Sequence, residues 1–293
     1  MAGIFKKLVL AGLLALAPQY SHSQEPITIL RIEEPVKEAV QGDFITEETP
    51  QNSALVQKAF KAVQNATIPI RHEACFEDIL GKSPTNYKGG KGRGVFLSSN
   101  NSLFYATCLH NAHISEVDAQ KFIRERFEKE NVTSIINPSK SLVWLDDILL
   151  NSTPKSDDSK DIAVYNVTHL ADKLTKKYTP LEILSRNQNI FRLGDKVNWL
   201  NYSNTSSPSL EFAKLVNLNI SNTNRNFSGG IEADKPITFG YSGQSIFNIS
   251  KYGEVNIRGI ITNMRGEGVK NGNCIFVPIS AVQDLIRSFQ SRN

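Results

Sequence analysis

Three short segments, far apart in the chain, carry residue types that together could perform acyl transfer. They contain His110 in TCLH, Asp161 in DIAV and Ser242 in GYSG, in that order. A serine hydroxyl is a weak nucleophile at neutral pH, so a neutral imidazole must take its proton and a carboxylate must orient that imidazole. These three residues are the predicted catalytic set.

Glycines flank the serine, two positions before it and one position after it. Glycine permits a sharp backbone turn, and such a turn can aim the amide N–H groups of Gly240 and Ser242 at one point. We predict that these two amides form an oxyanion hole, the pair of donors that stabilises negative charge developing on a substrate carbonyl.

Other residues could take each role. His113 lies three residues after His110 but off the pattern, and we expect it at the surface. Asp161 alone precedes an apolar, strand-like run. The segment 228–230 (SGG) also has the form of a nucleophile turn, but Asn226 stands where the first glycine should, so a flexible loop is the preferred interpretation. The rival carboxylates stand in polar runs typical of solvated side chains: Asp146, Asp147, Asp157 and Asp158.

Histidines and cysteines also allow a metal-binding interpretation, in which soft ligands surround an ion. Their spacing is irregular, and the thiols of an exported chain are expected to oxidise, so we predict neither a metal nor another cofactor. The three cysteines could form one disulfide and leave one thiol, and the sequence does not say which pair forms. The candidate ligands are His72, Cys75, Cys108, His110 and His113, and the third cysteine is Cys274.

The amino terminus has the pattern of a secretory signal. Lys6 and Lys7 precede an apolar run over 8–17, and the small residues Ser21 and Ser23 follow it. The run is shorter than the roughly 20 residues that a bilayer span needs. We therefore expect residues 1–23 to be removed from an exported protein, secreted or periplasmic, with no stable membrane insertion; an uncleaved anchor is the alternative.

Composition narrows the class of protein. The 293 residues are 40% hydrophobic and 21% charged, which suits a folded core and argues against wholesale disorder. The net charge is +4, and +2 without Lys6 and Lys7. So weak a charge gives no electrostatic case for nucleic acid as a partner.

Secondary-structure patterns predict an all-β fold with a few helices. From about residue 68, short β-rich runs alternate with Gly, Asn and Ser turns, and Asn100-Asn101 predicts a hairpin. Residues 24–67 are polar and weakly patterned, so we expect an N-terminal extension or pro-segment outside the main core. Helices are predicted over 53–64, 115–130 and 278–289. The predicted strands include 95–97, 103–105, 142–145, 162–165, 196–199, 245–247 and 255–257.

These segments resemble those of trypsin-like (chymotrypsin-fold) serine proteases, above all the bacterial exported members, including the high-temperature-requirement type. The resemblance runs from Gly92 to Leu285. The family's GxGF, TAAH, DIAL and GNSGGP motifs are similar to residues 92–96, 107–110, 161–164 and 240–248, and its later strands to 191–197, 253–260 and 276–280.

The resemblance implies two six-stranded antiparallel β-barrels with the active site between them. Residues 68–180 would form the first barrel, with His110 and Asp161, and residues 181–293 the second, with Ser242 and a closing helix. The implied activity is a serine endopeptidase that acts on a protein or peptide. The family's primary pocket would correspond to Pro236, Ile237, Thr238, Ile261, Thr262 and Asn263, which include no charged residue.

Two departures from the family pattern affect the functional prediction. Tyr241 replaces the Asp that, in animal members, pairs with a new N-terminal amine, so we expect no such activation switch. Gln244 and Ser245 replace a Gly and a Pro and could crowd the place where substrate backbone lies. A catalytically inactive binding protein of the same fold is therefore the alternative function.

Overall fold

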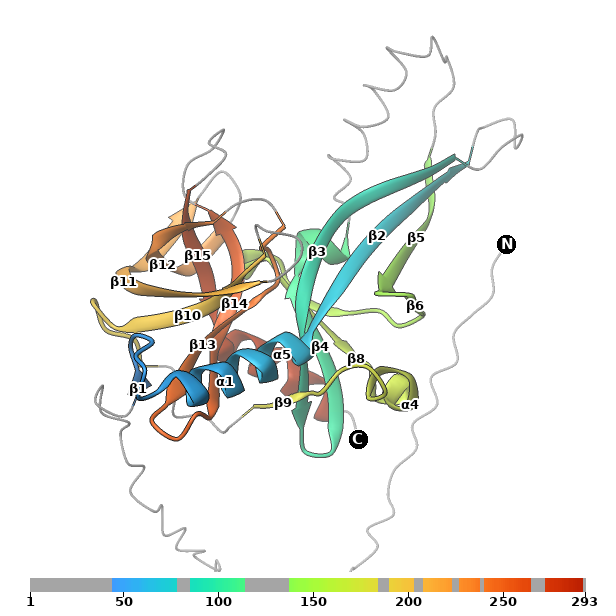
Figure 1. Ribbon diagram of the computed structural model, residues 1–293. Coiled ribbons are helices and arrows are strands. Elements are labelled where there is room, and N and C mark those ends of the chain that lie inside the picture. Colours follow the sequence, from blue (N-terminus) through green and yellow to red (C-terminus); the bar gives the residue numbers. More distant parts are fainter. Residues whose placement is uncertain are drawn as a thin grey trace, which may run out of the picture. The chain divides into compact units, whose positions relative to one another are not determined.

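The computed structural model describes residues 44–77, 85–113, 137–183, 190–202, 208–222, 227–237, 240–264 and 272–291 (Figure 1). All of them belong to one compact unit, Glu38–Asn293. The predicted signal segment and the helix expected over 115–130 lie outside the described residues. Within these ranges, no helix has the length and hydropathy needed to cross a membrane.

One sheet closes into a six-stranded barrel. The sheet order is β1-β13-β10-β11-β12-β15-β14, and β13 also pairs with β14, which closes a ring of six strands. The seventh strand, β1, pairs with β13 outside this ring. Trp199 and Phe276, both fully buried, lie in its core. The strands are β1 (Phe44–Ile45), β10 (Lys196–Asn201), β11 (Ser209–Asn222), β12 (Phe227–Ile237), β13 (Ser245–Ser250), β14 (Val255–Met264) and β15 (Gly272–Pro278).

The other sheet is curled but open among the described residues (Figure 1). Its order is β6-β5-β2-β3-β4-β8-β7, with β9 parallel to β3. The edge strands β6 and β7 have three residues each, and among the described residues no pairing between them closes the sheet, so the predicted first barrel is a curled half-barrel there. The strands are β2 (Thr67–Glu77), β3 (Thr85–Ser99), β4 (Ser102–Cys108), β5 (Asn137–Leu145), β6 (Ile148–Leu150), β7 (Lys155–Asp157), β8 (Ile162–Asn166) and β9 (Leu181–Glu182).

The predicted strands, hairpin and closing helix are confirmed where the structure describes them, but the flexible loop expected over 228–230 is wrong, because these residues lie in β12. All seven predicted strand runs lie within strands. Asn100 and Asn101 have φ of 48° and 61°, the left-handed conformation that a two-residue hairpin requires. The closing helix is α5 (Ile279–Gln290), and its buried face lies in a hydrophobic cluster that also contains residues of both sheets.

Helix α1 (Ser53–Ala66) confirms the predicted helix but not its expected place outside the core. Its apolar face, with Val56, Ala59 and Val63 at 0–1% exposure, packs in a cluster with Phe247 and Ile249 of β13. An amphipathic face of this width needs a partner, and the barrel wall supplies one. The remaining helical turns are α2 (Leu109–Ala112), η2 (Asp158–Lys160), η3 (Thr168–Leu170) and α4 (Ala171–Leu174).

A buried histidine makes the stability of the fold depend on pH. His72 of β2 is 1% exposed, and burial, assisted by the charge of nearby His113, lowers its pKa to about 4. In the unfolded chain its pKa is about 6.5, so between pH 6.5 and pH 4 the unfolded state binds more protons than the folded state. Stability therefore falls as pH falls through this window.

Replacing His72 with Phe should remove part of this pH dependence. Between pH 6.5 and 4.5 we expect the free energy of unfolding to fall by about 2 kcal/mol less in the variant than in the original chain. Urea titrations at several pH values measure the effect. The same change at the exposed His169 is the control. Equal slopes in the His72 variant and the original chain would contradict the assignment.

Candidate active site

The ends of two neighbouring strands place His110 beside Asp161. Strands β4 and β8 are antiparallel, and their last pair is Cys108 with Ile162. His110 follows the end of β4 in the short helix α2, and Asp161 immediately precedes β8. Asp161 has a φ of 51°, a left-handed conformation that aspartate tolerates better than most residues. The two side chains therefore meet at one end of the sheet.

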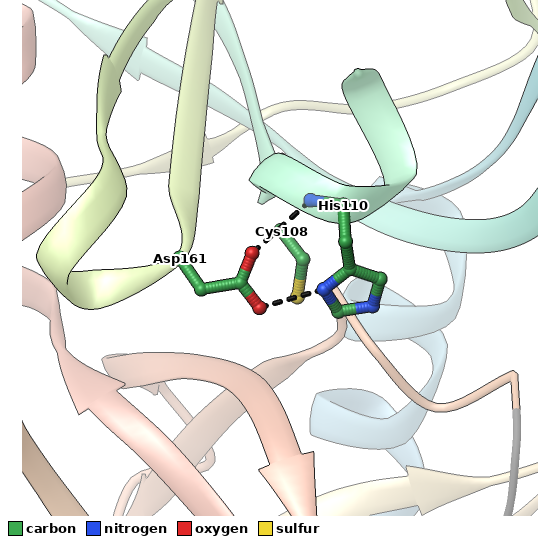
Figure 2. Close-up of side chains that lie close together, drawn as sticks. All are labelled: Cys108, His110 and Asp161. Carbon is green, nitrogen blue, oxygen red and sulfur yellow. Dashed lines mark hydrogen bonds and ion pairs between the residues drawn. The ribbon is translucent and has the colours of Figure 1, made fainter. Parts of the chain in front are cut away.

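Hydrogen bonds fix the two residues against one another (Figure 2). Asp161 Oδ2 lies 2.6 Å from His110 Nδ1, and Asp161 Oδ1 accepts from the His110 backbone amide at 3.1 Å. The Asp161 carbonyl accepts from the Leu109 amide at 3.0 Å. Because the carboxylate accepts at Nδ1, the neutral ring keeps its proton there and presents the Nε2 lone pair as a base. The His110 side chain is 48% exposed, so solvent can reach the ring.

The loop that carries Ser242 is bound to residues of the open sheet. The Ser242 carbonyl accepts from the Arg93 amide at 3.2 Å and from Asn111 Nδ2 at 2.9 Å. The Gly240 carbonyl accepts from Arg93 Nη1 at 3.1 Å. Since Asn111 is the residue after His110, the predicted nucleophile lies next to the segment that carries the predicted base.

Backbone hydrogen bonds within the closed barrel also hold this loop in place. The Tyr241 carbonyl accepts from the Gln244 amide at 3.1 Å, and the Gly243 amide donates to the Ile261 carbonyl at 2.7 Å. Gly243 has a φ of 90°, and a Cβ there would lie 1.8 Å from the Arg93 carbonyl oxygen. Only glycine fits this approach between the loop and β3.

The predicted oxyanion donors remain available within the described residues. Neither the Gly240 amide nor the Ser242 amide donates a hydrogen bond to any of them. Gly240 has a φ of 93°, which supplies the sharp turn expected from the sequence. In the same described part of the chain, no hydrogen bond joins Ser242 Oγ to the His110 ring. The complete triad and the oxyanion hole therefore belong to the functional proposal below.

The predicted pocket residues have different surroundings. Ile237 and Ile261, at 3% and 0% exposure, pack in the core of the closed barrel. Thr262 is 1% exposed, and its hydroxyl has no hydrogen-bond partner among the described residues. Pro236 is exposed. Thr238 and the side chain of Asn263 lie outside what the structure describes, so the pocket stays a prediction.

Cys108 borders the site as a free thiol. Its sulfur, with ligand atoms of His110 and Asp161, forms a group whose members all lie within 4.8 Å of one another (Figure 2). However, the thiol donates to the Ile261 carbonyl at 2.9 Å, and burial, followed by the charge of Asp161, raises its pKa well above the usual value. Metal binding needs the thiolate, so this environment disfavours a metal.

The other candidate ligands do not extend this group. His72 is buried in β2, and His113 is exposed, as predicted. Cys274 is a buried free thiol like Cys108, and the side chain of Cys75 lies outside the described residues. Every pair among the three cysteines includes Cys108 or Cys274, so these two free thiols leave no disulfide within the chain.

Two residues that bind the serine loop, Arg93 and Asn111, were not predicted as site residues from the sequence. Nearby glycines give a local signal for both residues. Arg93 stands between two glycines, and a Cβ at Gly92 would lie 2.2 Å from Asn111 Nδ2. These glycines indicate close packing around the loop, but not the identity of the partner 131 or 147 residues away.

Comparisons with known proteins bear on the fold. Similar solved structures include the HtrA-type protease AlgW with a decapeptide (14% identity, TM-score 0.50) and a serine-to-alanine variant of AlgW with a decapeptide (15% identity, TM-score 0.51). Each match covers 80% of this chain and 67% of the other. No protein-family model matches the chain, and no curated protein does. The likeness supports the chymotrypsin-like arrangement of two β-sheets.

Proposed function

We propose that this chain is a serine endopeptidase that cleaves peptide bonds through an acyl-enzyme. Ser242 is the nucleophile, His110 the general base and then acid, and Asp161 the orienting carboxylate. The observation that carries the proposal is the bond from Asn111 to the Ser242 carbonyl, because it places the serine loop beside a histidine already paired with a carboxylate. The substrate is a protein or peptide, as for the fold neighbours that hold a decapeptide.

The reaction follows from the roles of these atoms. Ser242 Oγ attacks the substrate carbonyl carbon while its proton passes to His110 Nε2. The carbonyl oxygen gains negative charge, and the Gly240 and Ser242 amides stabilise it. His110 then gives its proton to the leaving amine as the C–N bond breaks, which leaves the acyl-enzyme. Water attacks that ester by the same steps, and release of the acid restores the Ser242 hydroxyl.

The two departures from the family pattern are accommodated inside the protein. Gln244 is 2% exposed and Tyr241 is 4% exposed. The Tyr241 hydroxyl donates to Asn201 Oδ1 in β10. Because both side chains are buried, neither extends over the surface where substrate backbone would lie. This placement favours an active enzyme over the alternative of an inactive binding protein.

The location of the protein is part of the same proposal. The charged and apolar pattern of residues 1–23 supports export through a signal peptide, to the periplasm or outside the cell. A protease with no cofactor requirement suits such a compartment. The N-terminal sequence of the protein recovered from its native compartment tests this part of the proposal, because an intact Met1 would contradict it.

A fluorophosphonate probe tests the catalytic assignment directly. We expect the folded protein to form one covalent adduct on Ser242 and to hydrolyse peptides, and Ser242→Ala to lose the adduct and at least about 10⁴-fold of the turnover. Ser228→Ala is the matched control, because Ser228 also precedes a glycine but lies exposed in β12. Absence of an adduct in the folded chain would favour the inactive alternative, and an adduct that persists in Ser242→Ala would contradict the assignment of Ser242 as the nucleophile.

A further inference from the structure

Three consecutive carbonyl groups set the shape of the serine loop. The Gly240 carbonyl accepts from the Arg93 guanidinium, the Tyr241 carbonyl from the Gln244 amide, and the Ser242 carbonyl from the Arg93 amide and Asn111. Each carbonyl defines a peptide plane, so these bonds fix the planes on both sides of Tyr241 and the plane after Ser242. The N–H of Ser242 points opposite the bound Tyr241 carbonyl.

The guanidinium of Arg93 holds the first of these planes. It is the described side chain that binds the Gly240 carbonyl, and the bond is charge-assisted. If this bond were lost, the peptide between Gly240 and Tyr241 could rotate, since glycine permits several backbone conformations. The Gly240 amide, one of the two proposed oxyanion donors, belongs to the preceding peptide plane but is attached to the same Cα. A shift of Gly240 after loss of this bond would therefore displace that donor.

Arg93 is itself held in place. Its guanidinium carbon lies 3.9 Å from the centroid of the Tyr202 ring, directly after β10. Tyr202 packs in the hydrophobic cluster that contains α1. The Arg93 carbonyl accepts from Thr107 Oγ1 at 2.7 Å, which fixes the backbone below the side chain. An arginine fixed at both ends has little freedom to leave the Gly240 carbonyl.

We propose that Arg93 is a positioning residue, which holds the serine loop in the conformation that binds the oxyanion. This role rests on the proposed protease function. In this role, a residue of β3 in the open sheet controls a loop that belongs to the closed barrel. The Arg93 side chain, supported by the Tyr202 ring, keeps the loop in this conformation before substrate binds.

Arg93→Met tests this role, because it keeps an unbranched side chain but removes the donors and the charge. We expect kcat to fall about 10- to 100-fold, with KM changed less than about threefold, because an oxyanion donor acts in the transition state. Affinity for a peptide boronate, which resembles that state, should fall with kcat. Lys91→Met, an exposed change on the same strand, should leave kcat and KM unchanged. Arg93→Lys should recover part of the loss.

Hydrogen exchange provides a measurement that does not depend on catalysis. In Arg93→Met we expect the amides of Gly243 and Gln244 to exchange at least about tenfold faster, because their loop is less restrained. If Arg93→Met does not fold, Tyr202→Leu removes the stacking support and should produce smaller changes of the same kind. An unchanged kcat and unchanged loop exchange in a folded variant would overturn the proposal. Absence of fluorophosphonate labelling in the original chain would overturn only the protease function.

Discussion

Asp161→Asn should lower kcat by about 10⁴-fold while the chain stays folded. The carboxylate accepts both from the His110 amide and from His110 Nδ1. An asparagine can keep the bond to the backbone amide with its carbonyl oxygen, but its NH₂ group then faces Nδ1. The ring must accept there and carry its proton on Nε2, so it can no longer take the proton of Ser242.

Steady-state kinetics with a peptide substrate and the rate of fluorophosphonate labelling both measure this effect. We expect the two to fall together, because each depends on an activated Ser242 hydroxyl. Asp157→Asn is the matched control: Asp157 lies four residues away, where its carboxylate binds Ser159 and Lys160. A kcat within tenfold of the original in Asp161→Asn would show that this carboxylate does not orient the base.

Local sequence patterns predicted the strands beside His110 and Asp161, and the chemistry of a catalytic set predicted that these two residues pair. The apolar run after Asp161 identified it as the residue at a strand start, and the strand before His110 was equally clear. Two adjacent antiparallel strands then bring those two positions together, as β4 and β8 do. This part was predictable because each residue lies directly beside a strand with a strong local signal.

The support of the serine loop was not predictable from the sequence. The bond from Arg93 to the Gly240 carbonyl joins residues 147 positions apart, and the bond from Asn111 to the Ser242 carbonyl joins residues 131 positions apart. Residue type and spacing give no tertiary partner at such separations. Sequence patterns also do not predict how far the first sheet curls among the described residues, because this depends on whether the short edge strands β6 and β7 can reach one another.

The packing of α1 on the barrel was also not predicted from the sequence, and it has a testable consequence. A chain that begins at residue 67 should fail to fold, whereas a chain that begins at residue 42 should be stable and active. The truncation at residue 67 removes α1 and also β1, which pairs with β13. It therefore exposes Phe247 and Ile249, which are fully buried in the complete fold. Burial of an aliphatic or aromatic side chain contributes about 1.5–3 kcal/mol. Loss of several such contacts is comparable to the roughly 5–15 kcal/mol that stabilises a typical domain.

Circular dichroism, thermal melting and peptide hydrolysis of chains that begin at residues 24, 42 and 67 measure this effect. Two substitutions separate packing from length: Val56→Asp, at a fully buried position of α1, should reproduce the loss, whereas Lys58→Asp, on the exposed side of the same helix, should not. If residues 24–67 include a removable pro-segment, its cleavage must end before Phe44, because later cleavage would remove part of the core. A folded, active chain that begins at residue 67 would contradict this conclusion.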